Sequence, residues 1–239
     1  MSKTLPLFRD DAYLQTCIAE IIDVRDQGVI LDRTIFYPMG GGQPGDTGYL
    51  LLENGERLAV IDTVKGTLPG EIVHILDPQS AKPSAKIKVT AVLDWDRRYN
   101  HMRMHTALHL LSAVLSYPVT GGQVGAERSR LDFDMPEMSI TKEEITKKLH
   151  TMISGDHAVS ATSITDEELS NRPELVKTMS VKPPTGSGTV RLINVEKLDL
   201  QPCGGTHVRR TKEIGSVEVV KIEKKGRQNR RVILGFSNS

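Results

Sequence analysis

Short hydrophobic runs alternate with turn-forming residues along the first part of the chain. Each run is rich in Val, Ile and Leu and has the length of one strand, and pairs such as Asn54-Gly55 or Pro69-Gly70 separate the runs. Five or six short strands at about ten-residue spacing are typical of a small β-barrel. The predicted strands span residues 17–24, 28–37, 48–52, 58–64, 71–76 and 85–94.

The pattern changes at Trp95. No glycine or proline occurs from Asp96 to Tyr117, and leucines at 108, 111 and 115 recur at helical spacing, so residues 99–116 are predicted to form a helix that Pro118 ends. A second helix is predicted from 141 to 154, because a threonine and a glutamate three residues apart form a capping box at its start. A short third helix is predicted at 165–169, and strands at 130–134, 189–195, 215–222 and 231–236.

Together these elements predict an α+β fold with two domains. Residues 1–94 are expected to form an N-terminal small β-barrel that carries a glycine-rich motif, and residues 95–239 a domain with helices packed on an antiparallel sheet. A Pro- and Gly-rich stretch at 182–188 predicts a mobile loop, which either acts as a lid or merely connects its neighbours.

Composition adds a cellular expectation. No apolar run approaches the roughly 18 residues that a membrane helix needs, and the N-terminus has no signal-peptide core, so we expect a cytoplasmic protein without a membrane partner. The chain has two cysteines, and Cys17 sits in an apolar stretch where packing is more expected than reactivity. No disulfide framework is therefore predicted.

Positive charge gathers near the C-terminus. Residues 207–231 contain nine Lys and Arg against three Asp and Glu, although the whole chain carries a net charge of only +1. Such a cluster suits a phosphate backbone, and a solvated charged face is the alternative. The candidate RNA-binding cations are Arg209, Arg210, Lys224, Lys225, Arg230 and Arg231.

Four candidate metal ligands occur in two pairs of equal spacing. On the predicted helix, His105 and His109 lie four residues apart on one face, where a single ion can accept both imidazoles. Cys203 and His207 flank two glycines, which let the backbone bend until thiolate and imidazole face one point. Three imidazoles and one thiolate suit tetrahedral Zn²⁺. The alternative keeps the histidines as hydrogen-bonded groups on a half-buried helix and Cys203 as a packed thiol, and His101 is expected to lie outside the ligand set.

These motifs carry a resemblance to a known family. The segments around His105 and Cys203 resemble the editing domain of alanyl-tRNA synthetase and the free-standing alanyl-tRNA editing proteins called AlaX. The glycine-rich stretch at 31–48 is similar to that of the medium-length AlaX proteins, which have an N-terminal barrel. The resemblance covers nearly the whole chain. It implies zinc-dependent hydrolysis of tRNA(Ala) mischarged with serine, or with glycine, with the acceptor end as the partner and no nucleotide cofactor.

The resemblance also assigns residues. It implies zinc on the four ligands named above, Gln123 in the editing pocket, and Thr34 as the hydroxyl that helps to recognise serine. Asp132 is a weaker pocket candidate, because it matches the following strand. The loop that approaches the substrate is expected to include Gly40, Gly41, Gly42 and Gln43, with Gly45 and Asp46 completing it.

Alternatives remain for several of these assignments. Gln123 can instead close a loop, Thr34 can be an ordinary strand threonine, and the glycine run can be a plain tight turn; the run does not fit a nucleotide-binding loop. Four protein ligands resemble a closed structural zinc site, so a reactive ion requires an expanded shell, a weak ligand, or a role in positioning the substrate only. A zinc-stapled RNA-binding module is the second functional hypothesis. A zinc protease is disfavoured, because the histidine pair lacks the accompanying glutamate.

Overall fold

The computed structural model describes residues 3–179 and 188–237. The chain forms two compact units, Met1–Tyr99 and Asn100–Ser239, and the division falls within a long helix, α1 (Trp95–Leu115). The domain limits expected at 94 and 95 remain a prediction. Most of the loop predicted at 182–188 lies outside the described residues. No helix in the described part of the chain has the length and apolar character needed to span a bilayer.

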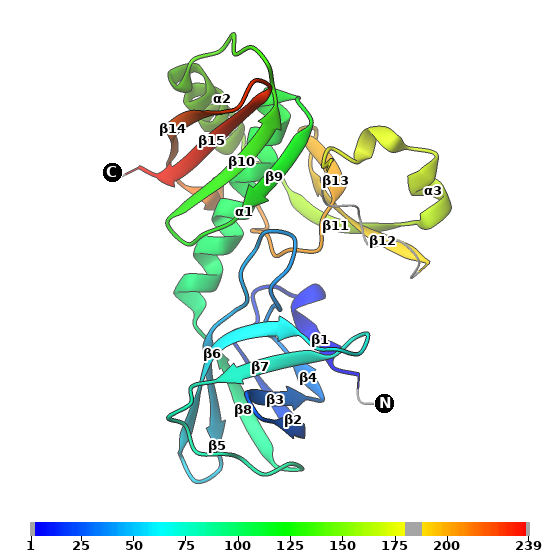
Figure 1. Ribbon diagram of the computed structural model, residues 1–239, viewed down its shortest axis with the longest axis vertical. Helices are drawn as coiled ribbons and strands as arrows, with labels where there is room; N and C mark the ends of the chain where they lie inside the picture. Colours follow the sequence, from blue (N-terminus) through cyan, green and yellow to red (C-terminus); the bar gives the residue numbers. More distant parts are fainter. Residues whose placement is uncertain (1–2, 180–187, 238–239) are drawn as a thin grey trace. The chain divides into compact units, whose positions relative to one another are not determined.

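The first unit is built around a closed barrel of antiparallel strands (Figure 1). Its elements are β1 (Leu5–Pro6), a 3-10 turn η1 (Leu7–Arg9), β2 (Thr16–Arg25), β3 (Gly28–Leu31), β4 (Arg33–Thr34), β5 (Gly48–Leu52), β6 (Arg57–Lys65), β7 (Ile72–Leu76) and β8 (Lys88–Leu93). The barrel order is β2-β3-β7-β6-β5-β8, and β8 pairs with β2 to close it. The short strands β1 and β4 pair with each other in parallel. The predicted barrel is confirmed.

Alternating side chains fill the barrel. On β8, Val89, Ala91 and Leu93 are buried, while the residues between them are half-buried. This two-residue period is the one that the hydrophobic pattern predicted. Trp95, at the start of α1, packs partly buried against the same core.

The glycine-rich motif forms a tight turn. Gly41 and Gly42 both have positive φ, at 58° and 81°, and backbone hydrogen bonds of 3.0 Å in both directions join Gly40 to Gln43. Positive φ at two successive positions favours glycine, because other residues are strained there. At Gly45 a Cβ would lie 2.1 Å from the carbonyl oxygen of Thr63, so only glycine fits. The glycine run therefore combines a tight turn with a close backbone approach inside the barrel unit.

A buried ion pair anchors this motif to the start of α1. The guanidinium of Arg98 donates to both carboxylate oxygens of Asp46, with Nε at 3.0 and 2.9 Å, and both side chains are fully buried. Arg98 also donates to the backbone carbonyl of Ile35 at 2.7 Å, and Asp46 accepts from the backbone N–H of Tyr37 at 2.6 Å. These bonds satisfy charges that would be costly to bury alone.

The second unit contains two antiparallel sheets and the remaining helices. Its helices are most of α1, α2 (Lys142–Ser154) and α3 (Asp166–Ser170), with 3-10 turns η2 (Pro173–Leu175) and η3 (Thr211–Ile214). Its strands are β9 (Val119–Gln123), β10 (Arg128–Asp134), β11 (Val159–Thr165), β12 (Thr189–Val195), β13 (Asp199–Pro202), β14 (Val217–Lys225) and β15 (Asn229–Phe236). One sheet has the order β14-β15-β10-β9, the other β11-β12-β13. In Figure 1 α1 and α2 lie on one face of the four-stranded sheet. The predicted α+β class is confirmed.

Side chains of α2 cap the edge of this sheet. Thr146 accepts a hydrogen bond from the backbone N–H of Val219 at 3.0 Å, and His150 Nε2 lies 2.7 Å from the carbonyl oxygen of Val217. The two helical residues are four apart and the two strand residues two apart, so one turn of helix matches one strand repeat. α2 thus satisfies backbone groups that an edge strand would otherwise expose.

Candidate metal centre

Helix α1 supplies two of the four predicted ligands. His105 and His109 are one turn apart, both are buried, and their ring centroids are 5.5 Å apart. Leu108 and Leu111 are buried on the same helix, so the histidines lie within a packed part of the unit. The predicted helix is present, and it places both imidazoles one turn apart as expected. His101, one turn earlier, is buried but is not a member of the cluster.

The segment that follows β13 supplies the other two. Cys203 continues from this strand, and its backbone N–H donates to the carbonyl oxygen of Arg191 on β12 at 3.1 Å. The Arg191 guanidinium in turn donates to the carbonyl oxygens of Cys203 and Gly205, at 2.8 and 3.0 Å. The N–H of Gly205 points back at the Cys203 sulfur at 3.4 Å. These bonds fold the segment so that His207 faces Cys203.

The four side chains converge. One ligand atom from each of His105, His109, Cys203 and His207 lies within 4.8 Å of the others. The Cys203 sulfur is 3.5 Å from Nε2 of His105 and 3.3 Å from Nε2 of His207. Two pairs of side chains that are nearly a hundred residues apart in the sequence can therefore hold one metal ion together.

The donor set and the two sulfur–nitrogen contacts of Cys203 fit a tetrahedral ion. Metal–ligand bonds of roughly 2.0–2.3 Å at tetrahedral angles place ligand atoms about 3.3–3.8 Å apart. The two sulfur–nitrogen distances, 3.3 and 3.5 Å, fall in this range. Three imidazoles and one thiolate are donors that bind zinc well, whereas calcium and magnesium prefer oxygen ligands.

Electrostatics favour the ligating form of the thiol. Burial alone would raise the pKa of Cys203, but the neighbouring rings of His105 and His207 outweigh it and hold that pKa well below its ordinary value. Burial, together with the proximity of His105, lowers the pKa of His207 to about 3, so its ring stays neutral. A thiolate and a neutral imidazole are the protonation states that bind a metal.

Further polar side chains, which the sequence analysis did not identify, surround the four ligands. Asp199 on β13 accepts from Nδ1 of His109 at 2.8 Å, and Nζ of Lys177 lies 2.5 Å from its other oxygen. Thr106 contacts Nδ1 of His207 at 3.2 Å. The only signal in the sequence is that Asp199, Gln201 and Cys203 occupy alternate positions; the first two lie on one side of β13, and Cys203 follows directly after the strand.

These surrounding polar groups also shift the pKa values of Asp199 and His109. Burial opposes charge on Asp199, but His109 and Lys177 lower its pKa to about 2. Burial likewise opposes charge on His109, while Asp199 and Cys203 raise its pKa to about 9. The buried carboxylate of Asp199 is therefore ionised beside the imidazole of His109.

Gln123 and Asp132 lie on the four-stranded sheet and are linked to each other through one arginine. Gln123 ends β9 with its side chain exposed, and its Oε1 accepts from Nε of Arg130 at 3.3 Å. Asp132 on β10 accepts from Arg130 at 2.6 Å and from Arg231 at 2.7 and 2.9 Å. Despite partial burial, these two guanidiniums lower the pKa of Asp132. The pocket roles expected for Gln123 and Asp132 stay predictions.

Thr34 belongs to the barrel unit and is fully buried. Its hydroxyl lies 2.7 Å from Nε2 of His74 and accepts from the N–H of Phe36 at 3.1 Å. Nδ1 of His74 contacts the carbonyl oxygen of Val29 at 3.3 Å, which makes Nδ1 the protonated nitrogen and Nε2 the acceptor. The hydroxyl hydrogen of Thr34 and one lone pair of its oxygen are thus both used within the barrel.

Five of the six predicted RNA-binding cations differ in their local contacts, and the sixth, Arg209, is exposed. Arg210 pairs with Asp156, Lys225 with Glu223, and Arg231 with Asp132. Arg230 donates to the carbonyl oxygen of Pro136 at 2.5 Å. Lys224 is exposed and lies opposite Arg230 in the β14–β15 pairing, so two cations face each other there.

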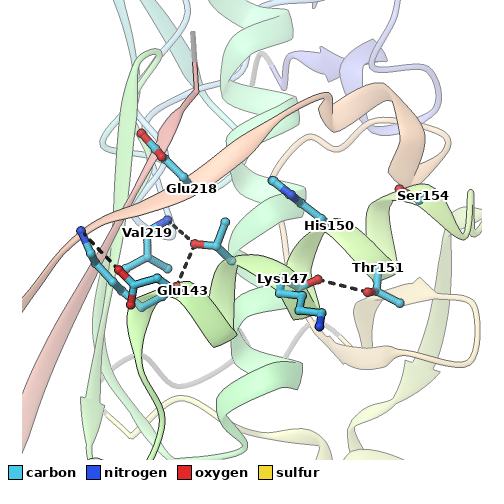
Figure 2. Close-up of a pocket in the computed structure, with 9 residues that line it drawn as sticks. Glu143, Lys147, His150, Thr151, Ser154, Glu218 and Val219 are labelled. Atoms are coloured by element: carbon cyan, nitrogen blue, oxygen red, sulfur yellow. Dashed lines mark hydrogen bonds and ion pairs between the residues drawn. The ribbon is translucent and has the colours of Figure 1, made fainter. Parts of the chain in front are cut away.

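Surface grooves lie elsewhere in the second unit. The groove between α2 and β14 contains none of the predicted site residues (Figure 2), and its lining consists of Lys142, Glu143, Thr146, Lys147, His150, Thr151, Ser154, Glu218 and Val219. A smaller hollow at the β14–β15 turn includes Lys225 and Arg227. The buried His and Cys cluster is therefore the stronger candidate site.

Comparison with known proteins adds independent findings. Residues 4–97 match the family model described as tRNA synthetases class II (A), and residues 190–233 match the second additional domain of threonyl and alanyl tRNA synthetases. The second match contains Cys203 and His207.

Relatives match over nearly the full length. The alanyl-tRNA editing protein AlaX-M of Saccharolobus solfataricus is 36% identical over 234 residues, which cover 96% of this chain and 97% of that protein. AlaX-L of Pyrococcus horikoshii is 34% identical, with 95% of this chain and 56% of its own length covered. An alanine–tRNA ligase of Saccharolobus islandicus is 34% identical over 94% of this chain but only 25% of its own. The chain belongs to the AlaX family of alanyl-tRNA editing proteins and matches its AlaX-M members over nearly the full length of both chains.

Proposed function

We propose that this protein hydrolyses the aminoacyl ester of tRNA(Ala) that carries serine, or glycine, and releases the free amino acid and intact tRNA. The observation that carries the proposal is the convergence of His105, His109, Cys203 and His207 on one point. Family membership supports it, because the similar proteins are named for alanyl-tRNA editing. A mischarged tRNA in the cytoplasm is the expected substrate.

We assign Zn²⁺ to this cluster, held by the three imidazoles and the thiolate. When bound, the ion supplies positive charge that polarises the ester carbonyl or makes a water molecule more acidic. The chain's own residues set the rest of the site. Cys203 and His207 are kept in ligating forms by their surroundings, whereas His109, whose pKa is raised to about 9, releases a proton when a cation binds.

Gln123 is proposed to hold the attacking water or the ester. Arg130 donates to its Oε1, which leaves the amide N–H groups as donors toward a carbonyl or water oxygen. Asp132 then acts through Arg130, which it holds from the other side. The three bonds that Asp132 accepts from two guanidiniums fit a supporting role better than proton transfer.

Thr34 is proposed to distinguish serine from alanine. The two amino acids differ by one hydroxyl, and a site built to bond that hydroxyl leaves a polar group unpaired when alanine enters. His74 takes the hydrogen of the Thr34 hydroxyl and the N–H of Phe36 uses one lone pair of its oxygen, which leaves one lone pair to accept a bond from the seryl group. Gly40, Gly41, Gly42 and Gln43 form the turn that we expect near the acceptor end.

The test is release of serine from purified Ser-tRNA(Ala). We expect His105→Ala and Cys203→Ala to abolish release, because each removes a ligand of the cluster. Cys17→Ala is the matched control, since the other cysteine lies in the barrel unit. Equal rates in the parent and in Cys203→Ala would refute the proposal. Binding of tRNA without release of serine would favour a zinc-stapled RNA-binding module instead.

A further inference from the structure

Asp199 is placed to act on the metal centre without being a ligand. Its side chain is fully buried, and it lies on β13 three residues before the end of the strand that leads into Cys203. Gln201 is buried on the same side of β13. The strand that delivers the thiolate therefore also delivers a carboxylate behind the cluster.

The contacts of Asp199 point in two directions. One oxygen, Oδ2, lies 2.8 Å from Nδ1 of His109 and accepts from the side-chain amide of Gln201 at 2.7 Å. The other, Oδ1, lies 2.5 Å from Nζ of Lys177, whose side chain is 27% exposed. The Gln201 amide nitrogen also donates to Ser112 on α1 at 3.1 Å and lies 3.1 Å from Nδ1 of His109, so it joins β13 to the helix that carries His109.

These contacts decide which nitrogen of His109 is available. A carboxylate accepts only, so Nδ1 of His109 carries the hydrogen and Nε2 is left for the ion. Without a fixed partner at Nδ1, the ring can rotate or present its other tautomer. Lys177 compensates the buried charge of Asp199, which would be costly to bury beside apolar groups alone.

We propose that Asp199 is the positioning residue of the metal centre: it holds the His109 ring with Nε2 toward the ion, and Lys177 holds Asp199 in place. This inference rests on the metal centre of the proposed function and is independent of the amino acid that is released. Carboxylates that orient metal-bound imidazoles usually contribute about 10–100-fold to metal affinity.

Metal binding tests the proposal directly. Metal-stripped parent, Asp199→Asn and Lys177→Met are titrated with Zn²⁺ against a chelator, and Co²⁺ is used as a spectroscopic probe. Asp199→Asn is expected to weaken Zn²⁺ binding about 10–100-fold and to alter the Co²⁺ absorption bands, because the amide is a weaker acceptor than the carboxylate and can also turn its NH₂ group toward Nδ1, so it no longer fixes the tautomer of His109. Lys177→Met is expected to show a smaller loss in the same direction. Glu223→Gln is the matched control, since Glu223 also bridges two cationic groups in the second unit but not those of the cluster.

The outcomes separate this inference from the proposed function. If the parent binds Zn²⁺ and folded Asp199→Asn binds it equally well, with the same Co²⁺ spectrum, the positioning role is wrong and the metal centre stands. If Asp199→Asn does not fold, Lys177→Met decides: reduced affinity supports the role, and parental affinity and spectrum overturn it. A parent that binds no Zn²⁺ overturns both.

Discussion

His74 makes the stability of the barrel unit depend on pH. It is fully buried in contact with Thr34, and burial, opposed only by its bond to the carbonyl of Val29, lowers its pKa from 6.5 to about 4. The unfolded chain therefore takes up a proton at a pH where the folded barrel does not. The stabilising contribution is complete above pH 6.5 and is lost as the pH falls toward 4. At pH 5 the free energy of unfolding should be about 2 kcal/mol lower than at pH 8 from this residue alone.

Trp95 provides the assay. It is the single tryptophan of the chain and packs against the barrel core, so its fluorescence reports unfolding of the barrel unit in urea. Unfolding is measured from pH 8 to pH 4.5 for the parent and for His74→Gln. The variant should be less stable at pH 8 but should lose less stability on acidification, because glutamine does not titrate. Parallel pH profiles for the two proteins would refute the reasoning, since all other titrating groups are shared.

Three further predictions follow from other contacts. Arg98→Met leaves Asp46 buried without its cation and should lower the free energy of unfolding of the barrel unit by about 3–5 kcal/mol, as measured by Trp95 fluorescence. The double variant Asp46→Leu/Arg98→Met should recover part of this loss. No loss in the single variant would contradict the ion-pair account. Thr34→Val should erode the preference for the seryl over the alanyl ester with zinc content unchanged, and unaltered ratios of the two hydrolysis rates would remove Thr34 from the site. Lys224→Glu should weaken tRNA binding and reduce the slope of its salt dependence by about 1 or more, whereas Lys142→Glu on α2 should not; an unchanged slope for Lys224→Glu would make that region solvated surface only.

The elements that the sequence predicted well are those with a clear hydrophobic period. The barrel strands alternate buried and half-buried residues, and α1 repeats leucines at helical spacing, so both patterns are visible without coordinates. The strand predicted at 28–37 is shorter, because β3 ends at Leu31 and the chain continues into the short β4.

The elements that the sequence did not predict have no such period. β11 is mostly exposed and rich in Ser and Thr, β9 contains two glycines, and β13 has four residues that end in proline. Their strand conformation comes from pairing with neighbours, such as β11 and β13 on either side of β12, which is a property of the folded unit.

The candidate site divides in the same way. The four ligands are recognisable because their residue types and spacing are restricted by metal chemistry. Asp199 and Lys177 were missed, because a lone aspartate and a lone lysine have many uses and their role depends on distances of 2.8 and 2.5 Å that only the fold creates. Arg98 was missed for the same reason.

The most direct test of the central claim is zinc-edge X-ray absorption on the purified, metal-loaded protein. A single ion held by the four side chains predicts one zinc per chain, with three nitrogen ligands and one sulfur ligand at tetrahedral distances, and the sulfur contribution should disappear in Cys203→Ala but persist in Cys17→Ala. A spectrum without sulfur, or a protein that retains no zinc, would contradict the claim that His105, His109, Cys203 and His207 form one metal centre.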